Sequence, residues 1–481
     1  MPLNPENLRQ LFRDCGDFCA VPVRLGGADG NLQATLCYLD GLVDGDSVSR
    51  EVLKPLTEQA RFGDARTPAR AAELLSEGLA YYYAFRVRSS LDEVVNDLLG
   101  GWSALVFDGF AASFETKMGN VRSIDKPEAE KAVKGSKDAF VETFRINTSL
   151  LRRKIRSAEL KLKESEVGRR SKTRVALAYL EGLTNPDMLA QVERRLKDID
   201  IDGLLTTGDL EEYLLEKNSP FPQITVTERP DRFAMELLDG RVGLLVDGIP
   251  LAFLLPSTFA ELLRVPEDHA GHYIVASILT LLRYSALLIS VLLPAVYVAI
   301  TMYHHEMIPT KLMLSIIHSK QDVPFSTAAE ALGMLIAFEL LQEAGLRLPS
   351  SIGETVSIIG ALIVGQSAVE AKVISPVVVI VVAVAGITGY TMPNQDLAAA
   401  LRLCRFVMVL LSLAFGLFGM VIGALLLVYY LCTLESLGTA YLSPFCDGSF
   451  REVLCVLLRP PLKTRKRRER WLRPLNVRRQ K

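Results

Sequence analysis

Long runs of residues without a single charge occupy the second half of the chain, and they limit the possible folds more than any other feature. Three of them cover Tyr284–Met302, Val373–Gln395 and Phe406–Leu434, with 19, 23 and 29 residues. A helix that crosses the hydrocarbon core of a membrane needs about 20 mostly apolar residues. Because soluble cores rarely require several helices of this kind, these runs predict an integral membrane protein.

A shorter uncharged run, Thr355–Val369, has 15 residues and ends at Glu370. As a helix it would rise only about 22 Å at 1.5 Å per residue, less than the roughly 30 Å of the hydrocarbon core. We therefore expect it inside a ring of longer helices. Leu362, Gln366 and Glu370 share one face of this helix, which offers an apolar constriction and a polar mouth, as in a cation pore. Local hydrogen bonding of Gln366 and pairing of Glu370 with Lys372 are the alternative.

The segment Phe325–Ala344 is apolar but contains three carboxylates, Glu330, Glu339 and Glu343. An ionised carboxylate at mid-bilayer costs several kcal/mol, so three of them exclude an isolated lipid-facing span. We expect this helix to lie at the membrane interface, to be re-entrant, or to face a watery interior. Each carboxylate then needs water, a basic partner or the interface, and Arg347 lies four residues after Glu343.

Two pairs of similar motifs divide the first half of the chain. Tyr38–Asp44 resembles Tyr179–Asn185, and each follows an apolar strand-like run. Asp108-Gly109 and Asp247-Gly248 each stand between two apolar runs, which is a strong signal for a β-hairpin. The two pairs recur at nearly the same offset, so we predict two tandem duplicated α/β subdomains. Amphipathic helices are expected after the first motif of each copy, at Ser47–Gln59 and, with Asn185 as N-cap, at Pro186–Ile199.

The expected fold class is therefore an α/β cytoplasmic region of two duplicated subdomains followed by an all-α transmembrane bundle of four to five apolar helices. We expect the subdomains at residues 1–120 and 173–268, with a charged helical linker at 121–172. The transmembrane domain is expected at 269–445, with spans near 284–302, 355–370, 373–393 and 406–432, and an interfacial or re-entrant helix at 325–344. A basic cytoplasmic tail is expected at 446–481.

The C-terminal tail is strongly basic, with eleven Lys or Arg among its last 23 residues, Arg459–Lys481. A basic segment next to an apolar helix indicates the cytoplasmic side of a membrane. Nucleic-acid binding is not indicated, because no aromatic platform or folded motif accompanies the charge. The N-terminus lacks the apolar core of a signal peptide, and four spans would leave both ends in the cytoplasm. Arg402 and Arg405 would then lie on the outer side.

The sequence contains no combination of residues typical of an enzyme. GxSxG, HExxH, the phosphate-binding GxxxxGK[ST] and a GxGxxG with its acidic partner are all absent. The seven cysteines form no CxxC pair, so neither a zinc site nor a disulfide framework is predicted. His269 and His272 lack a third ligand nearby. We therefore expect no catalytic, cofactor or metal site.

Many spaced motifs, in order, resemble one known family. They are Tyr38–Asp44, Asp200–Gly203, Pro220–Asp231, Leu244–Gly248, Pro324-Phe325, Glu330–Leu332, Phe338-Glu339, Glu343–Pro349, Ile352-Gly353, Ser357–Ala368 and Ser375-Pro376. Nearly end to end, the chain resembles the A subunit of the GerA-type spore germination receptors, a family with a related stage V sporulation protein AF branch. Gln342 stands where an Arg is expected in that pattern.

This resemblance implies a membrane subunit of a germinant receptor in the spore inner membrane, involved in nutrient-triggered germination and ion release. It implies a transporter-like B subunit and a lipoprotein C subunit as partners, and a homo-oligomeric, ligand-gated channel. The candidate pore or gating residues are Leu362, Gln366, Glu370, Glu330, Glu339 and Glu343. A secondary transporter and an AF-type accessory channel subunit are the alternatives. The transporter is disfavoured because the spans are few and the membrane half shows no internal repeat.

Overall fold

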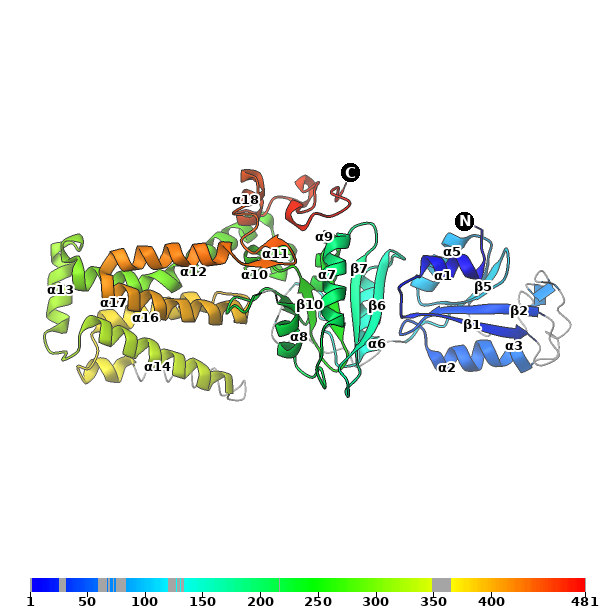
Figure 1. The fold of residues 1–481 in the computed structure, drawn as a ribbon, viewed down its shortest axis with the longest axis horizontal. Coiled ribbons are helices and arrows are strands. Elements are labelled where there is room, and N and C mark those ends of the chain that lie inside the picture. Colours follow the sequence, from blue (N-terminus) through cyan, green and yellow to red (C-terminus); the bar gives the residue numbers. More distant parts are fainter. Residues whose placement is uncertain are drawn as a thin grey trace.

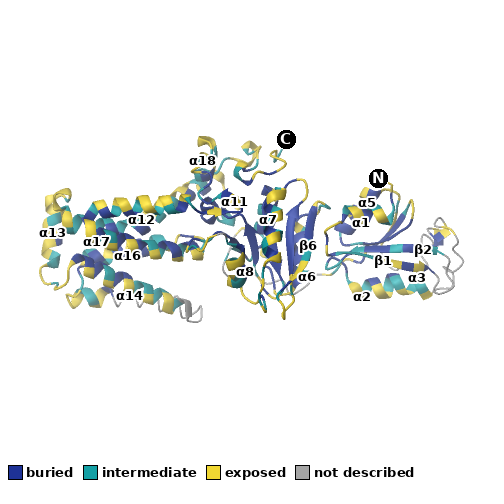
Figure 2. Cartoon of the chain, viewed as in Figure 1, coloured by how far each residue is buried: buried dark blue, intermediate teal, exposed yellow. Residues whose placement is uncertain are grey.

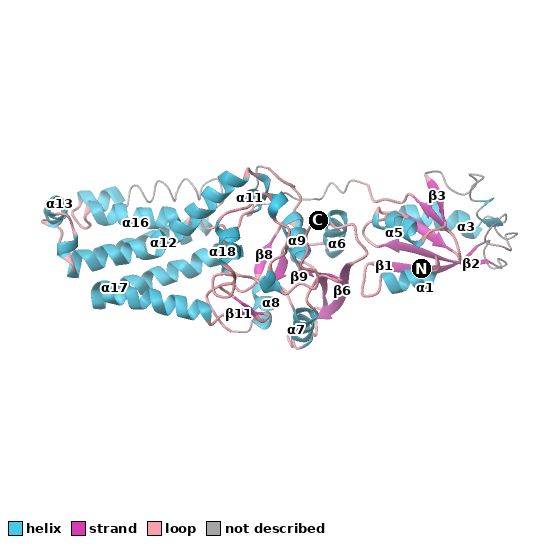
Figure 3. Cartoon of the chain, turned by 90° about the horizontal axis from the view of Figure 1, so that it is seen from above, coloured by secondary structure: helices cyan, strands magenta, loops and turns pink. Residues whose placement is uncertain are grey.

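The computed structural model describes residues 2–25, 32–58, 84–119, 134–215, 217–347 and 365–480, and the single positions 67, 70, 71, 73, 74, 127 and 130. Two sheet-containing regions follow one another along the long axis of the molecule, and a helical bundle lies at the opposite end from the first of them (Figure 1). The chain ends beside the second sheet region. The bundle itself is built from helices, as Figure 3 shows.

The first sheet region contains five antiparallel strands in the order β1-β2-β4-β5-β3. Its elements are α1 (Pro5–Leu11), β1 (Phe18–Leu25), β2 (Leu32–Leu39), α2 (Gly45–Ser47), a π-helical turn (Val48–Leu53), α3 (Lys54–Glu58), β3 (Phe85–Arg88), α5 (Leu91–Leu99), β4 (Ser103–Val106) and β5 (Ala111–Phe114). Successive side chains of a strand point to opposite faces. Accordingly, Leu36 packs in one core with Val52 and Leu56, while Cys37 packs in another with Leu98.

The second sheet region has the same pattern, five antiparallel strands in the order β6-β7-β9-β10-β8. Its elements are α6 (Phe144–Lys154), β6 (Leu160–Val167), β7 (Thr173–Leu180), α7 (Pro186–Lys197), α8 (Thr207–Leu214), β8 (Thr225–Thr227), α9 (Pro230–Asp239), β9 (Val242–Val246), β10 (Ala252–Leu255), α10 (Phe259–Leu262) and α11 (Pro266–Ala270). Strands β9 and β10 are buried along their whole length, and dark blue dominates this sheet in Figure 2.

Both Asp-Gly pairs lie in hairpin turns, as predicted. Asp108-Gly109 joins β4 to β5, and Asp247-Gly248 joins β9 to β10. Gly109 has φ of 93° and Gly248 has φ of 81°, a left-handed conformation that glycine adopts without steric cost. The helix predicted after the second copy of the first motif is also confirmed, because α7 begins at Pro186 and the Asn185 side chain accepts a hydrogen bond from the Asp187 amide at 2.9 Å.

The expected helical linker at 121–172 needs correction. Within its described residues, only 144–154 form a helix, and 160–167 form β6, the edge strand of the second sheet. The charges in this segment suggested a solvated helix. Leu160 and Leu162 nevertheless alternate with Lys161 and Lys163, and both leucines are fully buried. This period of two is the pattern of a strand with one face in the core.

The bundle consists of α12 (Tyr273–Tyr303), α13 (Thr310–Lys320), α14 (Thr327–Arg347), α16 (Pro376–Gly389) and α17 (Gln395–Cys432). It is followed by β11 (Glu435–Ser436), β12 (Thr439–Ala440) and α18 (Phe450–Leu457). Among the described residues, α12 and α17 are long and apolar enough to cross a membrane, and α16 is a shorter apolar helix. Exposed residues follow the outer faces of the bundle helices (Figure 2). Most of the expected span at 355–370 lies outside the described residues, and 365–370 are helical.

The uncharged run at 406–432, expected as one helix, is divided at Gly416. This residue has φ of 60° and ψ of −143°, outside the helical region. A β-carbon placed on Gly419 would collide with the carbonyl oxygen of Leu411, and one on Gly423 would meet the sulfur of Met408. Residues on both sides of Gly416 therefore lie against each other, and α17 is a hairpin of two helical arms, 395–415 and 417–432.

Candidate functional site

Glu330, one of the predicted site residues, is buried where three helices of the bundle meet. Its side chain is 2% exposed. One carboxylate oxygen lies 3.0 Å from Nζ of Lys320 at the end of α13, and the other accepts a hydrogen bond from the Ser375 amide at 2.7 Å. Ser375 precedes the first residue of α16, so Glu330 also complements the positive end of that helix. One oxygen of the carboxylate thus faces an ammonium group and the other a backbone amide.

A second polar layer crosses the bundle closer to the sheet regions. Glu339 of α14 lies 3.0 Å from Nε of Arg402 in α17. Arg405, 4% exposed, donates a hydrogen bond to the Ser290 hydroxyl in α12 at 2.6 Å, and this hydroxyl donates to the carbonyl of Ala385 in α16 at 3.0 Å. These polar contacts connect α12, α14, α16 and α17. They involve two guanidinium groups, one carboxylate, one hydroxyl and one backbone carbonyl.

Arg402 and Arg405, which the four-span arrangement would place on the outer side of a membrane, both make contacts with other helices of the bundle. Both guanidinium groups point into the bundle contacts just described. The two arginines are three residues apart and so share one face of the helix. Their sequence positions give no indication of the partners, because Glu339 and Ser290 lie on other helices.

The remaining predicted residues do not join these two layers. Glu343 belongs to α14, and the side chain of its expected partner Arg347 lies outside the described residues, as does Leu362. Gln366 and Glu370 are exposed and hydrogen-bonded to each other at 2.9 Å. Lys372, the alternative partner of Glu370, lies 2.5 Å from Asp322 instead.

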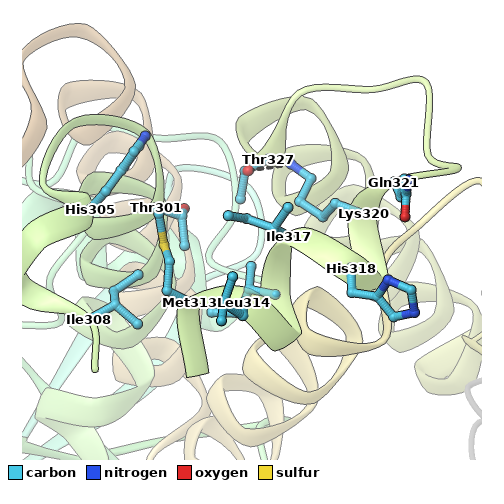
Figure 4. A pocket seen from close by; sticks show the side chains of 11 residues that line it. Thr301, His305, Ile308, Met313, Leu314, Ile317, His318, Lys320, Gln321 and Thr327 are labelled. Atoms are coloured by element: carbon cyan, nitrogen blue, oxygen red, sulfur yellow. Dashed lines mark hydrogen bonds between the residues drawn. The ribbon is translucent and has the colours of Figure 1, made fainter. Parts of the chain in front are cut away.

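A cavity of about 630 Å³ lies beside α13 (Figure 4), at the end of the bundle far from the sheets (Figure 1). It is lined by residues from the end of α12, the segment after it, α13 and the start of α14. Its walls are Thr301, His305, Ile308, Met313, Leu314, Ile316, Ile317, His318, Lys320, Gln321 and Thr327. Lys320 connects the cavity to the ion pair, since its ammonium group donates to Thr327 at 2.5 Å and also contacts Glu330. The lining residues form no recognisable motif in the sequence.

The bundle is joined to the second sheet region by contacts around the end of α17. The Tyr430 hydroxyl donates to the Ser219 hydroxyl at 2.9 Å, and Lys217 donates to the carbonyl of Thr433 at 2.8 Å. Tyr441 is fully buried, with its ring between those of Phe221 and Phe259. The second sheet region and the bundle are therefore in direct contact.

The basic tail is not free in solution but docked on the second sheet region. Glu469 in the tail lies 2.8 Å from Nη1 of Arg264 and 3.1 Å from Nη2 of Arg465. Arg479 lies 2.8 Å from Asp239 at the end of α9. Burial alone would raise the pKa of Glu469, but Arg264, Arg465 and Arg241 outweigh it and hold the pKa at about 2. Some of the charged residues in the tail therefore form ion pairs with the second sheet region.

One titratable pair at the junction of α8 and α17 leads to a pH prediction. Burial, and then the nearby Asp396 carboxylate, raise the pKa of Glu211 to about 7. In an unfolded chain, a glutamate side chain has a pKa of about 4.3. Between that pH and about 7, Glu211 is therefore protonated in the folded chain but ionised in the unfolded chain. Stability should therefore fall as pH rises from about 4 to 7. We expect a melting temperature higher at pH 5.5 than at pH 7.5, and a smaller difference in Glu211→Gln. Identical pH profiles for both proteins would contradict this assignment.

Comparison with known proteins gives a consistent result over nearly the whole chain. The family model described as Bacillus/Clostridium GerA spore germination protein matches residues 6–471. The chain is 36% identical over 472 residues to the uncharacterized membrane protein YfkQ of Bacillus subtilis strain 168, covering 97% of this chain and 90% of that protein. It is 34% identical over 470 residues to spore germination protein B1 of the same strain, covering 97% and 95%.

One solved structure is also similar. It is the N-terminal domain of the A subunit of the Bacillus megaterium spore germinant receptor GerK3, with 28% sequence identity and a TM-score of 0.43. The similarity covers 54% of this chain and 98% of that domain.

Proposed function

Because the chain belongs to the Bacillus/Clostridium GerA spore germination protein family, we propose that it is the A-type membrane subunit of a spore germinant receptor. The observation that carries this proposal is the match of the family model from residue 6 to residue 471, which includes both the sheets and the bundle. By the family resemblance, its partners are a transporter-like B subunit and a lipoprotein C subunit in the spore inner membrane. The subunit converts a nutrient signal into ion release.

In this proposal, the helical bundle spans the membrane and both sheet regions lie in the cytoplasm. Support comes from the apolar character of α12, α16 and α17. The hairpin in α17 returns the chain to the end of the bundle where α12 begins. Contacts of Arg459 with the carbonyls of His269 and Gly271 hold the tail there. An even number of crossings would then leave the sheets and the basic tail on the same side.

We also propose that the two sheet regions arose by duplication. The matching strand orders and the equivalent Asp-Gly hairpins support this. A duplicated pair stacked end to end gives a long cytoplasmic region in which one copy contacts the bundle and the other extends away from it.

We propose that the segment 355–370 conducts ions in an oligomer of this chain. The buried carboxylate of Glu330 and the Glu339–Arg402 pair have protein partners, which suits bundle stability better than ion transport. Gln366 and Glu370 are exposed in the single chain, as residues that line a central pore between subunits should be. A ring of Leu362 could gate by dewetting, and a ring of Glu370 would attract cations.

Cation flux from liposomes containing the full chain and its receptor partners tests this function. Glu370→Gln should lower the cation flux several-fold, because it removes the ring of charge while keeping the side-chain shape. Leu362→Ala should raise the flux without nutrient. Glu306→Gln, at an exposed carboxylate elsewhere in the bundle, is the matched control and should leave the flux unchanged. Normal conductance in both variants would exclude this segment from the pore.

A further inference from the structure

Two cysteine side chains meet just beyond the last helix of the bundle. Sγ of Cys432, the final residue of α17, lies 3.5 Å from Sγ of Cys446. Both residues are exposed. We propose that Cys432 and Cys446 form a reversible, redox-responsive dithiol site that closes to an intramolecular disulfide. In cytoplasmic proteins, such disulfides are usually transient and redox-sensing rather than structural.

The chain on both sides of the pair is held by other contacts, so the cysteines are brought together by the fold. At the α17 end, the Tyr441 amide donates to the carbonyl of Leu434 at 2.9 Å. On the other side, Phe445 packs edge-on against Tyr284 of α12, with ring centroids 6.0 Å apart. A disulfide needs sulfurs about 2 Å apart. Small side-chain movements are therefore enough to close the bond.

Cys446 itself lies in a compact turn that hydrogen bonds hold closed. The Ser443 hydroxyl donates to Asp447 at 2.8 Å, and the Gly448 amide donates to the carbonyl of Pro444 at 2.9 Å. These bonds fix the backbone on each side of the thiol. The site thus differs from a lone exposed cysteine, such as Cys455 in α18.

The chemistry is a two-electron thiol–disulfide exchange with a small-molecule disulfide such as oxidised glutathione. The Cys432 thiolate attacks one glutathione sulfur and releases the first glutathione thiolate, leaving a mixed disulfide. The Cys446 thiolate then attacks the Cys432 sulfur and releases the second. The protein loses two electrons and two protons, and the oxidised glutathione becomes two reduced molecules. Burial, and then the adjacent Cys432 thiol, raise the pKa of Cys446 to about 11, which favours Cys432 for the first attack.

Closure would connect the end of α17 to the segment that leads into α18 and the tail. The closed loop contains β11 and β12, and the buried Ser436 hydroxyl in it donates to the carbonyl of Gln223 at 2.9 Å. Oxidation therefore restricts the junction at which the bundle meets the second sheet region. The site depends on this geometry alone, so it can be tested independently of ion flux.

The test is oxidation of the full chain in detergent with oxidised glutathione, followed by denaturation and maleimide counting of free thiols. The unoxidised chain should show all seven cysteines, and the oxidised chain should show two fewer. Peptide mass spectrometry without reductant should connect the peptides of Cys432 and Cys446. Amide hydrogen exchange of residues 435–440 should slow and recover after reduction.

Matched variants separate the pair from the other thiols. Cys432→Ser and Cys446→Ser should each abolish the crosslinked peptide, and Cys455→Ser should leave it unchanged. An unaltered thiol count, a crosslink between two chains, or a crosslink that depends on Cys455 would overturn the proposal. Normal ion flux together with a crosslink would leave the redox site standing, because it does not rest on conduction.

Discussion

Replacing Glu330 with alanine is expected to lower the free energy of unfolding of the bundle by about 3–5 kcal/mol, the range for breaking a buried ion pair from one side. The substitution leaves the Lys320 ammonium group without its carboxylate and the Ser375 amide without its acceptor. It also opens space where α13, α14 and α16 meet. Unfolding of the full chain in mixed micelles with increasing denaturant measures the loss.

An exposed ion pair in the same bundle provides the control. Lys372 and Asp322 lie 2.5 Å apart, but their side chains are 63% and 62% exposed. Exposed pairs contribute about 0–1 kcal/mol, so Asp322→Ala should have a small effect. The double variant Glu330→Ala, Lys320→Ala should lose less stability than the two single losses combined. Equal effects of Glu330→Ala and Asp322→Ala would mean that Glu330 is accessible to water.

The features that could be predicted from the sequence are those carried by short-range patterns. The Asp-Gly hairpins at 108 and 247 and the start of α7 at Pro186 depend on a few neighbouring residues, and the structure contains all of them. The apolar runs also correspond to helices at α12, α16 and α17. Each of these patterns lies within one helix or one hairpin, so it can be recognised without knowing which other segments pack against it.

The partners of the buried charges depend on tertiary structure, and the sequence does not specify them. Glu339 and Arg402 belong to different helices, and so do Arg405 and Ser290. The sequence marks Glu330 and Glu339 as costly groups in need of partners, and in the structure each has a basic partner. β6 was missed because its lysines and glutamates masked the alternation of Leu160 and Leu162.

The turn within α17 was missed for a different reason. Glycine is common in transmembrane helices, where small residues permit close packing, so Gly416 gives no local signal of a reversal. Its backbone conformation is one that only glycine adopts easily. The close approach of Gly419 to Leu411 becomes visible only when both arms are placed side by side.

Gly416→Ala is therefore expected to destabilise the bundle by about 1–3 kcal/mol, the cost of holding a residue other than glycine in such a conformation. The added β-carbon would also lie only 3.1 Å from side-chain atoms of Tyr303. Gly333→Ala in α14 is the matched control, because a β-carbon there meets nothing within 4 Å. That variant should be neutral or more stable, since alanine favours helices.

Spin labels at positions 403 and 428, both exposed, test the hairpin itself in a cysteine-free background. Packed helices lie about 8–10 Å apart, so the hairpin places the two backbones at close range across its arms. One straight helix would instead separate them by about 38 Å at 1.5 Å per residue. The parent protein should give the short distance, and Gly416→Ala should broaden the distribution toward longer values. A single long distance in the parent would show that residues 395–432 cross as one helix, which would reverse the side on which the basic tail emerges.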